Sequence, residues 1–119
     1  MRRQHRMAKY PCRVRKLRKS ARLSQRELAR LLGLRSQGVL SQIEAGVKRP
    51  SLMLAFASAV VLGETIPELY PALFARAERR ALAGARELHQ AIAKARKRSD
   101  AKAYVAALIS RLDEINAHV

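Results

Sequence analysis

Residues 23–33 read Leu-Ser-Gln-Arg-Glu-Leu-Ala-Arg-Leu-Leu-Gly and contain both a start and a stop signal for a helix. Ser24 stands three residues before Glu27, the spacing of a capping box in which each side chain accepts from the other residue's backbone amide. Apolar side chains follow at helical spacing, namely Leu28, Ala29 and Leu32. Gly33 suits the left-handed residue that ends many helices. The segment therefore predicts a short helix over residues 25–32.

Similar punctuation on both sides predicts more short helices. Val14 and Leu17 indicate one helix before this segment, and five apolar stripes bounded by Ser, Thr, Gly or Pro follow it. The expected helices cover residues 12–21, about 36–45, 52–62, 65–70, about 72–98 and from about 100 onward. No segment shows the period-2 alternation of a strand, so the expected fold class is all-α. The expected organisation is a flexible basic arm over 1–11, a compact domain over 12–70 and a helical hairpin over 71–119.

Positive charge is concentrated in the first part of the chain. The 119 residues contain 25 Lys and Arg against 9 Asp and Glu, a formal net charge of +16. Residues 1–50 alone hold 15 basic and 2 acidic side chains. Such a one-sided balance favours a polyanionic partner, with nucleic acid as the first candidate and an anionic membrane surface as the second.

Other classes of protein are not supported by the composition. A single cysteine, Cys12, and three scattered histidines give neither a disulfide framework nor a zinc site, so no metal and no cofactor are expected. The longest apolar stretch, residues 52–62, is too short to span a bilayer, which favours a cytoplasmic protein without a membrane partner. No nucleophile–base pair stands out, so no catalytic residue is assigned and an enzyme is not expected. Nearby arginines favour a lowered pKa for the Cys12 thiol.

Five segments, taken in order and spacing, resemble the phage-repressor helix-turn-helix family, also called the XRE/Cro family. They are residues 23–33, 39–46, 48–52, 59–63 and 65–69. The resemblance implies a five-helix lambda-repressor-like DNA-binding domain over residues 12–70, followed by a two-helix extension. It also implies a sequence-specific double-stranded DNA-binding transcriptional regulator, a repressor in many members, whose recognition helix at about 36–45 enters the major groove.

The resemblance assigns roles to individual residues. Base edges would be read by Gln37, Ser41, Gln42 and Arg35, and phosphates would be contacted by Gln25, Lys48 and Arg49. Arg18 and Glu44 would form a buried bridge that serves the fold rather than base reading. One departure concerns residues 34–38, where this chain has one residue more than the common spacing and Gly38 at a position that often reads a base. The conformation of that turn decides which residues at the start of the recognition helix would contact bases.

The segment 52–62 is apolar almost all round, and one side of it cannot face the domain core. An exposed apolar patch of Met53, Ala57 and Val60 would then mark an interface. We expect a homodimer on a palindromic operator, with the C-terminal helices, including Leu108, as its main element. The alternative is that the hairpin folds back onto its own domain.

Two other functions remain open from the sequence. An antitoxin of a toxin–antitoxin pair resembles the same fold and also binds a toxin. An interaction or co-activator module would use the fold to hold protein or RNA instead of reading DNA. Discrimination between duplex sequences separates the regulator from the module, because non-specific polyanion binding shows a steep salt dependence and no sequence preference.

Overall fold

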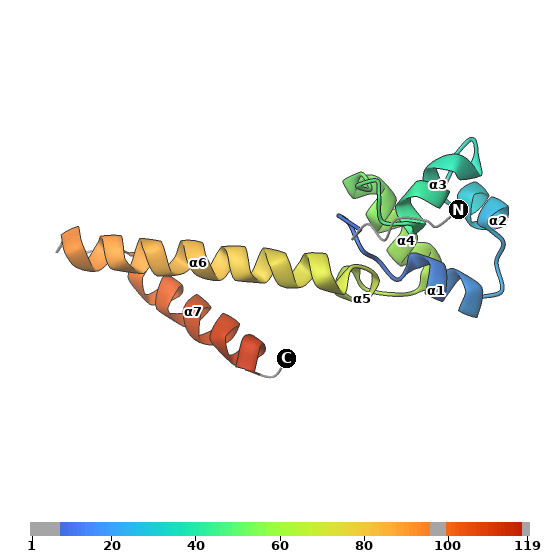
Figure 1. The fold of residues 1–119 in the computed structure, drawn as a ribbon. Coiled ribbons are helices and arrows are strands. Elements are labelled where there is room, and N and C mark those ends of the chain that lie inside the picture. Colours follow the sequence, from blue (N-terminus) through green and yellow to red (C-terminus); the bar gives the residue numbers. More distant parts are fainter. Residues whose placement is uncertain (1–7, 96–99, 118–119) are drawn as a thin grey trace, which may run out of the picture. The chain divides into compact units, whose positions relative to one another are not determined.

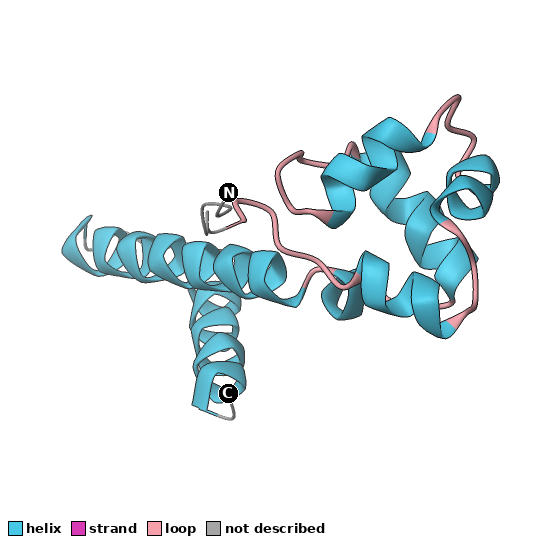
Figure 2. Cartoon of the chain, turned by 45° about the vertical axis from the view of Figure 1, so that its right-hand side comes forward, coloured by secondary structure: helices cyan, strands magenta, loops and turns pink. Residues whose placement is uncertain are grey.

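A computed structural model of the chain describes residues 8–95 and 100–117. In that part every regular element is a helix, as Figures 1 and 2 show, which confirms the all-α prediction. The helices are α1 (Val14–Ser20), α2 (Gln25–Leu31), α3 (Gln37–Glu44), α4 (Leu52–Leu62), α5 (Ile66–Leu69), α6 (Pro71–Ala95) and α7 (Lys102–Ala117). None of the described helices is long and apolar enough to cross a membrane.

Local hydrogen bonds start the short helices where the sequence indicates. The Ser24 hydroxyl accepts from the Glu27 amide at 3.0 Å, and the Glu27 carboxylate accepts from the Ser24 amide at 2.8 Å. The hydrogen bond from the Ser24 amide, and then the Ser24 side chain, lowers the pKa of Glu27, because donors to the carboxylate favour its charged form. Thr65 and Glu68 form a second capping box at the start of α5. The helix boundaries therefore follow from interactions within a few residues of sequence.

The N-terminal unit comprises the described residues up to Phe74 and has one core. Side chains from α1, α2, α3 and α5 fill it, namely Val14, Leu28, Ala29, Leu40, Leu69 and Tyr70. Helix α4 covers the core with Ala55, Ala59 and Leu62, which are half-buried. Five helices around one core give the architecture that the sequence resemblance implies.

The start of the described chain packs beside Gly46. Of the arm predicted over residues 1–11, residues 1–7 lie outside the described part. The Tyr10 amide donates to the Gly46 carbonyl at 2.9 Å. A Cβ at position 46 would stand 2.5 Å from the Ala8 side chain, and the φ of 77° there is left-handed. Glycine is therefore required where the chain crosses the end of α3.

The C-terminal unit begins at Ala75 and consists of most of α6 together with α7. Its seam contains four buried side chains, namely Leu82, Ala85, Val105 and Leu112. Arg86 and Asp113 form an exposed ion pair at 2.6 Å between the two helices. The division falls after Phe74, whereas the sequence placed it after Tyr70, because Leu73 still packs against the N-terminal core.

Candidate nucleic-acid interface

Helix α3 turns an apolar face inward and a polar face outward. Leu40 and Ile43 are almost fully buried. Three of the four predicted base readers lie on the exposed side of the same helix, namely Gln37, Ser41 and Gln42. The fourth, Arg35, is exposed in the turn before α3. The four side chains therefore share one accessible region and carry the amide, hydroxyl and guanidinium groups that recognise base edges.

A buried ion pair holds the end of α3 against α1. Arg18 Nε donates to Glu44 Oε2 at 2.6 Å, and Arg18 Nη2 donates to Glu44 Oε1 at 3.1 Å. The two side chains are only 9% and 2% exposed. Arg18 Nη1 also donates to the Leu23 carbonyl at 2.8 Å, which ties in the turn before α2. The structure thus brings this pair together inside the fold, away from the exposed polar face of α3.

Gln25 is part of the same polar cluster. Its Nε2 donates to Glu44 Oε1 at 2.9 Å, although the resemblance assigns Gln25 to a phosphate. A side-chain amide carries two N–H donors, so one remains at the exposed start of α2. Sequence reasoning missed this contact because Gln25 and Glu44 are far apart along the chain.

Lys48 and Arg49 lie in the loop that follows α3. Both side chains are exposed. The backbone amides of Val47 and Lys48 donate to the Gln42 carbonyl at 3.1 and 3.3 Å. These bonds hold the start of the loop against the C-terminal end of α3, so the two cations lie beside that end.

A second group of cations surrounds the start of α3. Arg26 and Arg30 lie one turn apart on α2, and Arg35 lies in the next turn of the chain. Together they line a hollow of about 550 Å³ that also reaches Ser36 and Gln37. Sequence reasoning did not single out Arg26 and Arg30, although their i, i+4 spacing opposite the buried Leu28 is a signal for an outward basic face. The polar face of α3 thus has cations at both ends.

Helix α4 exposes large apolar side chains instead. Met53 is 74% exposed and Val60 is 81% exposed, and Leu52 and Phe56 also lie on the surface. Ala57 is half-buried between them. Leu108, the other predicted interface residue, is half-buried in the C-terminal unit.

Cys12 is held beneath the end of α3 rather than on a charged surface. Its thiol donates to the Ile43 carbonyl at 3.4 Å. Burial raises the pKa of Cys12, so the prediction of a lowered pKa is wrong. Desolvation of the thiolate, assisted by the Glu44 charge, outweighs the hydrogen bond from the Val14 backbone. The described residues contain no group of three or more side chains arranged to bind a metal ion.

Comparison with family models gives one match, to the helix-turn-helix model over residues 14–69. Comparison with curated proteins and with solved structures gave no match. The matched residues run from the first residue of α1 to the last residue of α5, so they coincide with the five-helix core and contain the polar face of α3. Residues 14–69 of this chain thus match the helix-turn-helix family of the XRE/Cro type, a DNA-binding domain.

Proposed function

We propose that this chain is a sequence-specific transcriptional regulator, a repressor that inserts α3 into the major groove of double-stranded DNA. The observation that carries the proposal is the exposed polar face of α3, flanked by cations and anchored from behind by Leu40 and Ile43. The major groove is about 12 Å wide and admits an α-helix. A repressor acts by occupying DNA that the transcription machinery needs, and such a role would be carried out in the cytoplasm.

Base reading is assigned to the outward side chains of α3 and to Arg35. Gln37 and Gln42 each offer an acceptor and a donor, which fits the N6 and N7 edge of adenine. Ser41 stands between them on the exposed face and bonds either kind of edge. Arg35 presents the planar fork that fits guanine O6 and N7.

Phosphate contacts are assigned to the cations at the two ends of α3. Lys48 and Arg49 serve the backbone beside the C-terminal end, and Arg26 and Arg30 serve the backbone beside the N-terminal end. Gln25 adds its second amide N–H at the start of α2, where the helix dipole also favours a phosphate. These contacts place α3 in the groove without reading sequence.

A homodimer on a palindromic operator completes the proposal. The C-terminal unit has a single seam between two helices, a small core for a unit that must be stable by itself. Pairing with a second copy would bury further apolar surface of α6 and α7, including Leu108, in a four-helix arrangement. The exposed Met53 and Val60 and the half-buried Ala57 of α4 would be buried between copies as well. A two-fold dimer reads two half-sites about 34–36 Å apart.

Selection of bound sites from random duplex DNA tests the proposal directly. We expect one recurrent motif with two inverted half-sites. The Gln42→Ala variant should alter the preference at one base pair in each half-site and leave the others unchanged. Binding that is strong only at low salt, with no enriched motif, would contradict base reading and favour a module that holds polyanions or proteins.

A further inference from the structure

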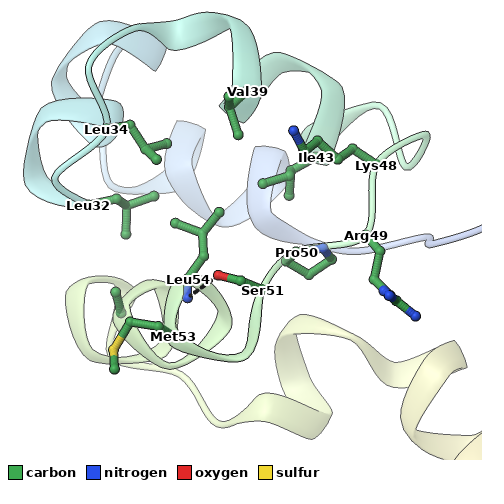
Figure 3. Close-up of a pocket in the computed structure, with 11 residues that line it drawn as sticks. Leu32, Leu34, Val39, Ile43, Lys48, Arg49, Pro50, Ser51, Met53 and Leu54 are labelled. Atoms are coloured by element: carbon green, nitrogen blue, oxygen red, sulfur yellow. Dashed lines mark hydrogen bonds between the residues drawn. The ribbon is translucent and has the colours of Figure 1, made fainter.

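An apolar cavity of about 540 Å³ lies between α3 and α4 in the N-terminal unit. Figure 3 shows five aliphatic side chains pointing into it from α3, α4 and the turn before α3, namely Leu32, Leu34, Val39, Ile43 and Leu54. Pro50, Met53 and Ala57 complete the apolar lining. The volume falls within the range of pockets that hold small organic ligands.

The charge at the rim of this cavity is positive. Lys48 and Arg49 are the only charged residues in the lining of the described cavity. In Figure 3 the Lys48 side chain extends across Ile43, whereas the Arg49 guanidinium points away. The Ser51 hydroxyl is already used, because it accepts from the Leu54 amide at 3.1 Å. Lys48 is therefore the polar group at the rim that is placed to meet a ligand.

We propose that this cavity binds a small amphipathic carboxylate, a medium-chain alkyl or an aryl acid, with its apolar part among the leucines and its carboxylate on Lys48. An apolar interior with one cation at its edge matches an apolar body with one anionic end. A neutral apolar ligand would gain nothing from the exposed Lys48 ammonium, and a dianion would bring charge into an aliphatic lining.

Occupation of this site would act on DNA binding, and this step rests on the function proposed above. Val39 and Ile43 belong to the inner face of α3, so a ligand in the cavity touches the recognition helix from behind. Lys48 cannot bind a ligand carboxylate and a DNA phosphate at the same time. The acid therefore competes with DNA and lowers its affinity, in the manner of an inducer.

A second copy of the chain is the main alternative occupant. Val60 is exposed on α4 and does not line the cavity, whereas the exposed Met53 belongs to its lining. A hollow of this size with a cation at its rim fits a small anion better than it fits a helix face. Binding of a second copy would increase the size of the particle in solution, whereas binding of a small acid would not.

Titration of the full chain with decanoate, followed by calorimetry and by NMR, tests the site without DNA. Decanol serves as the neutral probe of equal chain length. We expect saturable binding of decanoate, with shifts at Val39 and Leu54. The Lys48→Gln variant should weaken decanoate about tenfold, as expected for loss of a charge-assisted contact, and leave decanol unchanged.

Replacing a small side chain that lines the cavity with a large one allows a comparison with the same replacement outside the cavity. Ala57→Phe places a ring in the cavity and should abolish decanoate binding, while all charges stay the same. Ala83→Phe makes the identical change at an exposed position of α6 and should leave binding unchanged. Circular dichroism shows whether each variant folds. If Ala57→Phe does not fold, Ala57→Leu introduces a smaller side chain at the same position.

Three results would overturn the site: no saturable binding, equal binding by Ala57→Phe, or a change in particle size on saturation, which would identify a second copy as the occupant. Equal loss of decanol and decanoate binding in Lys48→Gln would overturn the carboxylate assignment. If decanoate binds and operator affinity is unchanged, the coupling is wrong and the site stands. If the chain selects no DNA motif, the proposed function fails while the titration still decides the site.

Discussion

Helices α3 and α4 follow one another in the chain and rest on the same core, yet they present opposite chemistry to the outside. Helix α3 exposes two amides and a hydroxyl, and α4 exposes four large apolar side chains, namely Leu52, Met53, Phe56 and Val60. The inner faces are alike, because both contribute aliphatic groups to one interior. The inward face of each helix therefore decides the fold, and the outward face decides the partner.

The comparison extends to charge. The chain carries +16, so two copies repel one another wherever basic surfaces meet. Helix α4 contains no charged residue, whereas α1 and α2 each expose several cations. In the proposed dimer, contact between copies through α4 would avoid most of the repulsion and leave the cations around α3 available for DNA.

The largest expected effect comes from breaking the buried ion pair between Arg18 and Glu44, which holds α3 against α1. Helix α4 has no comparable ion pair. Glu44→Ala leaves the Arg18 guanidinium buried without its anion and should lower the free energy of unfolding by about 3–5 kcal/mol. Arg86→Ala, which breaks the exposed pair with Asp113, should cost at most about 1 kcal/mol. Urea denaturation of both variants measures the difference, and equal losses would show that the buried pair does not anchor α3.

The next effect concerns the outward face of α4. The double variant Val60→Glu and Leu108→Glu should convert dimers to monomers that bind a single half-site, with a loss of about 2 kcal/mol or more in dimerisation. Leu31→Glu, a charge introduced on an exposed apolar residue of α2, should leave the dimer intact. Sedimentation at micromolar concentration measures the state. An unmutated chain that is monomeric there would refute the dimer and favour the hairpin folding back on its own domain.

The outward face of α3 should respond in a different manner. Gln42→Ala should reduce discrimination at one base position by about 1–3 kcal/mol. Arg49→Ala should weaken every duplex alike and flatten the salt dependence, because phosphate contacts do not read sequence. Competition binding with specific and random duplexes separates the two. Equal losses on both duplexes for both variants would remove Gln42 from the base readers.

The smallest expected effect concerns the side-chain hydrogen bonds that cap the N-terminal ends of α3 and α4. The Ser51 hydroxyl caps α4, whereas the Ser36 hydroxyl makes no capping bond at the start of α3. Ser51→Ala should therefore cost about 1 kcal/mol in the free energy of unfolding, and Ser36→Ala should cost close to nothing. Thermal unfolding of the two variants gives the comparison. A larger loss for Ser36→Ala would show that its hydroxyl caps α3 in solution.

Much of the fold was predictable because its signals are local. The predicted bounds of α4 agree with the structure, and those of α2 differ by one residue. The residues on the outward side of α3 were also predictable, because helical periodicity separates them from Leu40 and Ile43. The roles of Arg18 and Glu44 came from the family resemblance, since no local pattern relates two residues on different helices.

What the sequence alone determined is the set of helices, the family and the uneven distribution of charge, all of which depend on residue type and on spacing within a few turns. Tertiary structure alone decided the hydrogen bond from Gln25 to Glu44, the raised pKa of Cys12 and the cavity between α3 and α4. Each of these depends on burial or on contact between segments distant in the chain. Burial changes hydration and packing, and neither can be read from the spacing of residues along one helix.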